Sequence, residues 1–282
     1  MFVVSAFSLF FSVVLHALVD RAAKYLNPFR YELSKHKDLT PEYVQKQHFI
    51  WQNTCVSFVH AVVSGIWSLS TFYFEPDSLK DLINLSTWRM TSLVSYSLGY
   101  FIFDSAHMAI LHPYRSTAEF LVHHFIVSTN IFIYLQIFLC FSSALLSGKY
   151  IGYAAVSLLP EVNSIFLHLR RAMNYLRVPK GNRFFHTTCL LNIGTFIVFR
   201  FMVLSWMAKW IVLNRDKISS GYYCLGSIGL SVLIVMNIVL FIRIVYADFF
   251  SKDKVSSASS SVSIIRSDAG TANKPHFSLH SS

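Results

Sequence analysis

Apolar residues gather into seven runs of about 18 to 29 residues, separated by shorter polar segments. A helix needs roughly 20 mostly apolar residues to cross the hydrocarbon core of a bilayer. The runs are too long for strands and lack the strict alternation of an outer-membrane barrel. Because a backbone in lipid must satisfy its own hydrogen bonds, the pattern predicts helical spans. The predicted spans are Phe2–Val19, Ile50–Phe74, Met90–Leu111, Phe120–Phe141, Tyr150–Leu169, Phe184–Val212 and Tyr222–Ala247.

Composition narrows the class of protein in the same direction. Of the 282 residues, 54% are hydrophobic and only 13% are charged, whereas soluble domains carry about 25% charged residues. These values exclude a disordered chain, a collagen-like fibre and an ordinary cytosolic enzyme. Four cysteines in a chain of this length do not make a disulfide framework. We therefore predict an all-α fold, a polytopic transmembrane helical bundle.

The first run has two interpretations, a cleaved signal peptide or a retained span. No Lys or Arg precedes the run, six follow it before the second run, and no clear small-x-small cleavage site is present. These features favour a retained first span with the N-terminus outside.

The distribution of Lys and Arg predicts the orientation of the remaining spans. With the N-terminus outside, the loops and the tail on the cytosolic side carry seventeen basic residues, and the outer loops carry six. Cytosolic loops are enriched in Lys and Arg, so the C-terminus is expected in the cytosol. The net charge of +10 is spread over several loops, which sets topology and does not indicate nucleic-acid binding.

The polar ends of the chain suggest its division into segments. From Ser251 onward, 11 of 32 residues are Ser and few are large and apolar, which is typical of a flexible tail. The predicted segments are an N-terminal transmembrane span (1–20), a cytosolic loop (21–44), a membrane domain (45–250) and a disordered Ser-rich cytosolic tail (251–282).

Ionisable residues inside the predicted spans are the candidates for function. Each costs at least about 2.5–3.5 kcal/mol at the centre of a membrane helix, so its presence requires a reason. The charged and imidazole candidates are His60, Asp104, His107, Glu119, His123, His124, Glu161, His168 and Arg200, with Asn192 and Asn237 as uncharged companions.

Five of the spans place a polar residue at a similar depth. At 1.5 Å per residue, these groups lie about 12–15 Å from the cytosolic ends of their helices, and His123 lies about 6 Å deep. A shared depth predicts one polar cavity that opens to the cytosol. Arg200 lies about 24 Å deep and therefore apart, with no partner identified by the sequence. The five residues are His60, Asp104, Glu161, Asn192 and Asn237.

Helical spacing indicates which candidates share a face. Glu119 and His123 are four residues apart, and Asp104 and His107 are three apart, so each pair shares a face. The adjacent His123 and His124 point about 100° apart. We interpret the isolated His16 and His168 as packing residues.

Four strings, in this order, resemble the TLC-domain family. They are SFVHAVVSG at Ser57–Gly65, GYFIFD at Gly99–Asp104, EFLVHH at Glu119–His124 and EVNSIFLHLR at Glu161–Arg170. The founding members of the family are the translocating-chain-associated and longevity-assurance proteins. The chain looks most like its calfacilitin-type "fluidity" branch, and the resemblance covers residues 45–250.

The resemblance implies a six-helix TLC core around a cytosol-facing polar cavity. With the N-terminal span this makes about seven spans. The better-known members are ceramide synthases, which join an acyl-CoA to a sphingoid base with a His pair and downstream acids. His123 and His124 match the pair, but the downstream His-Asp-x-x-Asp pattern is absent. Glu161, Asn163 and Ser164 occupy the corresponding stretch, which argues against ceramide synthesis.

The fluidity branch implies a regulator at the plasma membrane. Such proteins shape phospholipid acyl composition and limit the incorporation of long-chain polyunsaturated chains, which keeps the membrane less fluid. On this reading the protein is not an enzyme, requires no cofactor or metal, and has membrane phospholipids or acyl chains as partners. The expected polar residues of the lipid cavity are His60, Asp104, His107, Glu119, Glu161 and Asn163.

Two alternatives stay open. One is an acyl-CoA-dependent lipid acyltransferase, with acyl-CoA as a substrate, residence in the endoplasmic reticulum, and His123 and His124 as catalytic residues. A His acting as general base would contribute roughly 10²–10⁴-fold in rate. The other alternative is an accessory subunit of a channel. The sequence does not determine whether the protein forms a homo-oligomer.

Overall fold

The computed structural model describes residues 2–27, 41–111 and 135–247, and the regular elements in these ranges are helices. The predicted all-α fold is confirmed. Glu119, His123, His124 and the Ser-rich tail lie outside the described residues. The main helices are α1 (Phe2–Tyr25), α3 (Pro41–Phe74), α4 (Trp88–Leu111), α6 (Ile151–Val156), α7 (Glu161–Tyr175), α8 (Arg183–Phe196), α9 (Val203–Leu213) and α10 (Ser220–Val245), with a further helix at Leu135–Ser147.

Four helices in the described ranges are long and apolar enough to cross a membrane. They correspond to α1, to residues Val44–Phe74 of α3, to α10, and to a 31-residue helix, Arg183–Leu213, that joins α8 and α9 through a π-helical segment at Ile197–Met202. The chain is thus a multi-pass membrane protein. Helix α4 is more polar because it is rich in Ser and Tyr, and it is buried without interruption from Met90 to Tyr100.

The predicted span Tyr150–Leu169 differs from the observed structure. It is divided into the short α6 and the 15-residue α7, with a turn before Glu161. Pro160 has no backbone N–H and restricts the residue before it, so a continuous helix is interrupted there. Tight three-residue hydrogen bonds span the turn, including Glu161 N to Leu158 O at 3.0 Å.

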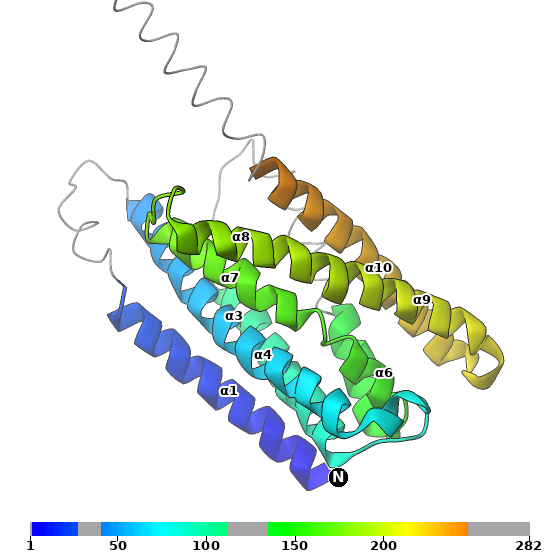
Figure 1. The fold of residues 1–282 in the computed structure, drawn as a ribbon. Helices are drawn as coiled ribbons and strands as arrows, with labels where there is room; N and C mark the ends of the chain where they lie inside the picture. The colour runs from blue at the N-terminus through cyan, green and yellow to red at the C-terminus, as the bar shows by residue number, and fades with distance from the viewer. Residues whose placement is uncertain (1, 28–40, 112–134, 248–282) are drawn as a thin grey trace, which may run out of the picture. The chain divides into compact units, whose positions relative to one another are not determined.

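Two glycines allow helices to approach closely. A Cβ added to Gly99 of α4 would lie 2.6 Å from the carbonyl oxygen of Leu9 in α1. A Cβ on Gly65 of α3 would lie 3.1 Å from the backbone nitrogen of Val162 in α7. Small residues at helix contacts are typical of membrane bundles. Helix α7 packs against both α3 and α8, between which it runs (Figure 1).

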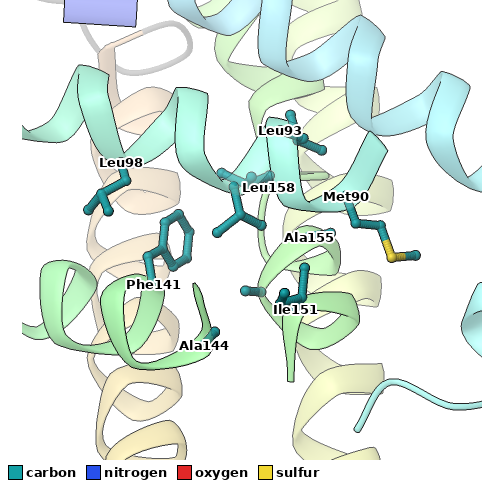
Figure 2. Packing of buried hydrophobic residues seen from close by; sticks show 10 residues of the cluster. Met90, Leu93, Leu98, Phe141, Ala144, Ile151, Ala155 and Leu158 are labelled. Carbon is teal, nitrogen blue, oxygen red and sulfur yellow. The ribbon is translucent and has the colours of Figure 1, made fainter. Parts of the chain in front are cut away.

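A hydrophobic core joins α4 to the helices that follow it. Figure 2 shows Leu98 of α4 beside Phe141, with Ala155 and Leu158 completing the contact from the α6 region. Apolar residues of α1 such as Phe2, Phe7 and Phe10 are exposed instead, as expected for side chains that face lipid. The described residues up to Val235 form one compact unit, and the last turns of α10, from Met236, belong to a second.

Candidate functional site

Arg200 forms a polar network that joins the π-helical segment to α7. Its Nε donates to Asn163 Oδ1 at 2.6 Å, and its Nη2 donates to Ser164 Oγ at 2.8 Å. The guanidinium also lies over the ring of Phe196, 5.3 Å from the centroid. The carboxylate of Glu161 adds an electrostatic attraction. The partner that sequence could not identify is therefore the first turn of α7.

Asn163 continues the network to α8. Its Nδ2 donates to Asn192 O at 2.8 Å, to Asn192 Oδ1 at 3.1 Å and to Thr195 Oγ1 at 3.0 Å. Because Oδ1 faces an obligate donor on Arg200, the orientation of the amide is defined. Asn163 and Asn192 are completely buried. A polar group buried at this depth is stable only when it is hydrogen-bonded.

The expectation that Arg200 lies apart from the other polar residues is wrong. Side chains on a helix lean toward its N-terminus, and the guanidinium of Arg200 returns past Phe196, one turn earlier. The charge therefore joins Asn163 and Ser164, although the Cα of Arg200 lies deeper. Depth calculated from Cα positions missed this because it ignored the length and direction of the side chain.

A second cluster combines two imidazoles with aromatic rings from three helices. The ring of His60 in α3 stacks on Tyr100 of α4, with centroids 3.8 Å apart and planes inclined by 8°. His16 of α1 lies 5.7 Å from His60 and 5.5 Å from Tyr96. The sequence prediction treated His16 as an isolated packing residue. The structure places it beside the predicted site residue His60.

Hydrogen bonds indicate which ring nitrogens carry protons. His16 Nδ1 donates to Ser12 O at 2.6 Å, so its Nε2 accepts from the Tyr96 hydroxyl at 3.4 Å. The Ser64 hydroxyl donates to His60 O at 2.7 Å, which leaves Ser64 Oγ as an acceptor for His60 Nε2 at 3.5 Å. His60 is 1% exposed. Its Nδ1 has no hydrogen-bond partner in the described part of the chain.

The predicted pair Asp104 and His107 lies on α4, and Asp104 is buried. His107 contacts Asp20 of α1, with Nε2 3.2 Å from Oδ1, within ion-pair distance although without hydrogen-bond geometry. Gln52 of α3 donates from Nε2 to the same oxygen at 3.0 Å. The sequence prediction missed Asp20 because it falls just beyond the first apolar run.

His168 of α7 links the two clusters. It lies within electrostatic range of His60, Arg200 and Arg171, each of which disfavours a positive charge on its ring. Of the predicted cavity residues, Glu161 and Asn163 interact with Arg200. His60 lies beside His16. Asp104 and His107 lie on α4, where His107 contacts Asp20. Asn237 lies in the second unit.

The described residues contain no group of three or more His, Cys, Asp or Glu side chains arranged to hold a metal ion. The chemistry that they offer is hydrogen bonding and charge: a guanidinium held by amide and hydroxyl oxygens, and a buried imidazole with one nitrogen unused.

Comparison with known proteins identifies relatives over most of the chain. TLC domain-containing protein 2 of Danio rerio is 38% identical over 214 residues, which cover 76% of this chain and 82% of that protein. TLC domain-containing protein 2 of Homo sapiens is 33% identical, covering 74% and 75%, and TLC domain-containing protein 1 of Homo sapiens is 28% identical, covering 71% and 75%. No solved structure matches the chain. The family profile of the TLC domain matches residues 50–246, and the chain therefore belongs to the TLC domain family.

Proposed function

We propose that the protein is a non-catalytic regulator of phospholipid acyl composition. In this proposal it binds a lipid or acyl chain within the bundle, limits the incorporation of long-chain polyunsaturated chains, and thereby keeps the membrane less fluid. Membership of the TLC domain family and the resemblance to its fluidity branch support this function.

The observation that carries the proposal is that side chains of the first turn of α7 bind Arg200. By the family resemblance, Glu161, Asn163 and Ser164 occupy the stretch where ceramide synthases carry their downstream acids. Here Asn163 Oδ1 and Ser164 Oγ accept hydrogen bonds from Arg200. An amide and a hydroxyl oxygen do not act as general bases near neutral pH, and here both are hydrogen-bonded to Arg200. The segment therefore acts as a joint between helices, which favours a binding protein over an enzyme.

The proposed location is the plasma membrane, with the N-terminus outside and the C-terminus in the cytosol. The excess of Lys and Arg in the loops assigned to the cytosolic side supports this orientation.

A lipid acyltransferase is the second candidate, favoured by one observation. His60 keeps Nδ1 without a partner in the described residues, and an unprotonated imidazole nitrogen is a general base. The predicted catalytic residues His123 and His124 lie outside the described residues, so the test must include them.

The function is tested by phospholipid mass spectrometry of cells that lack the protein and of the same cells re-expressing it. The proposal predicts a rise in long-chain polyunsaturated acyl chains on loss and a return on re-expression. An unchanged acyl profile would contradict it.

A transfer assay separates the two candidates. Purified protein is incubated with radiolabelled oleoyl-CoA and either lysophosphatidylcholine or sphingosine. The regulator transfers no label, whereas an enzyme transfers label in a reaction that His60→Gln or His123→Ala abolishes. Transfer by the wild-type protein that is lost in either variant would replace the regulator with the acyltransferase.

A further inference from the structure

One face of α7 carries a row of polar side chains. Glu161, Ser164, His168 and Arg171 are spaced by three, four and three residues, so they lie along one side of the helix. Arg200 joins this row through its hydrogen bond to Ser164. We call Ser164, His168 and Arg171 of α7, together with Arg200 of the π-helical segment, the basic face of α7.

The charges on this face do not balance. Two guanidiniums, Arg171 and Arg200, accompany a single carboxylate, Glu161, and that carboxylate interacts with Arg200. Among the described residues, no carboxylate lies within ion-pair distance of Arg171. Arg171 is exposed in the last turns of α7, where a guanidinium can attract the anionic headgroups of a membrane surface. The basic face therefore has the charge to attract an anion.

Two unused nitrogen atoms, one beside Asn163 and one on the basic face itself, provide a second, independent observation. Asn192 Nδ2 can only donate, the residue is 0% exposed, and this atom has no hydrogen-bond partner in the described residues. Within the same ranges His168 Nδ1 also lacks a partner. Leaving buried polar groups unpaired destabilises a fold. A ligand made only of acceptor oxygens would complement such groups.

We propose that the basic face binds the oxyanion of an acyl lipid, either the phosphate of a phospholipid or the carboxylate of a free fatty acid. Arg171 makes the principal ion pair, and His168 donates a hydrogen bond. The inference rests on the proposed function and gives it a ligand class, an acyl lipid whose headgroup oxyanion is held at α7.

The test is binding of defined lipids to the full-length protein in detergent, measured by native mass spectrometry. The probes are dioleoyl phosphatidic acid, oleate and oleyl alcohol, which share a chain and differ in the headgroup. The proposal predicts binding of one or both oxyanions and weak binding of the alcohol. The ratio of phosphatidic acid to oleate binding identifies the source of the oxyanion.

Variants connect the binding to the basic face. Arg171→Gln is expected to weaken binding of the oxyanion roughly tenfold, the usual effect of losing one charge-assisted hydrogen bond. Arg183→Gln, an equal loss of charge at the exposed start of α8, should leave binding unchanged. Arg171→Lys should retain most of the affinity, because an ammonium also binds phosphate. Each variant is compared by its thermal unfolding midpoint.

Two outcomes would overturn the inference: equal binding of oleyl alcohol and the oxyanions, or equal affinity in the Arg171→Gln and Arg183→Gln proteins. Failure of the proposed function would give a different result from failure of this inference. If loss of the protein leaves cellular acyl composition unchanged while Arg171-dependent binding persists, the site stands and the proposed function fails. If wild-type protein restores the composition but binds no oxyanion, the inference alone fails.

Discussion

Arg200 donates through Nε to Asn163 Oδ1 at 2.6 Å, and this bond joins the π-helical segment of a long membrane helix to the first turn of α7. A π-helical turn inside an α-helix is rare and often marks a functional position. The π-helical segment contains one charged residue, Arg200, and its side chain turns back toward Phe196. The bond therefore links an irregular backbone to a buried polar contact between helices.

Breaking this contact on one side should strongly destabilise the protein. Asn163→Leu leaves the guanidinium of Arg200 without its main acceptor, and a buried donor left unsatisfied costs about 1–3 kcal/mol, or more when it is charged. The double variant Asn163→Leu/Arg200→Met removes both partners and should be more stable than Asn163→Leu alone. Unfolding in sodium dodecyl sulfate measures the stability of each variant and therefore their order. A double variant less stable than the single one would contradict the assignment.

Gly99 should tolerate no side chain, because the Cβ position lies 2.6 Å from the backbone oxygen of Leu9. Gly99→Val must push α1 away from α4, at a cost of about 1–3 kcal/mol or more. Gly194→Ala is the control, since a Cβ there meets nothing within 4 Å, and alanine favours a helix by about 1 kcal/mol. Thermal unfolding should show a loss for the first variant and a gain for the second. Equal midpoints would refute the close contact.

His60 should be dispensable for stability. Its Nδ1 is buried without a partner in the described residues, so His60→Phe removes an unsatisfied group and retains stacking on Tyr100. We expect stability unchanged or raised by about 1–2 kcal/mol. Tyr100→Phe loses the hydrogen bond to Ser57 Oγ and should cost about 1 kcal/mol. A loss above that value in His60→Phe would show that Nδ1 makes an interaction in the membrane.

The loop between α3 and α4 should depend on pH through Asp81. Its Oδ1 accepts from the backbone nitrogens of Asn84 and Ile83 at 2.9 and 3.0 Å, and the hydrogen bond from Asn84 is the main cause that lowers the pKa of Asp81. A lowered pKa in the folded loop stabilises it above the ordinary carboxyl pKa, and this contribution is lost as pH falls through the lowered value.

Hydrogen exchange at Ile83 and Asn84 measures this effect. Protection should fall in acid for the wild-type protein. Asp81→Ala should show low protection at both neutral and acidic pH. Protection in the variant that equals that of wild type at neutral pH would contradict the role of Asp81.

The helices could be predicted from sequence because long apolar runs in lipid have few other conformations. The division of one predicted span at Pro160 could not be placed, since apolar periodicity does not show where a turn will be stabilised by packing. Glu161 was singled out by its cost in lipid, and Asn163 by the stretch that the family resemblance pointed to. Their partner Arg200 was not assigned to them, because a long side chain displaces its charge by about one helical turn from its Cα.

His16 and Asp20 show a further limit of sequence reasoning. Each is a single polar residue in or beside an apolar run, and its partners, His60 and His107, lie on other helices. Spacing along a helix reports which residues share its face. It does not report which helices lie together, and that pairing depends on contacts such as Gly99 against Leu9.

The most direct test of the account is the fraction of long-chain polyunsaturated acyl chains in plasma-membrane phospholipids. It is measured in cells that lack the protein and in the same cells supplied with wild-type protein or with Arg171→Gln protein at equal abundance. The account predicts a raised fraction without the protein, a lowered one with wild type, and incomplete lowering with the variant. The same fraction in cells with and without the wild-type protein would contradict a role in acyl composition.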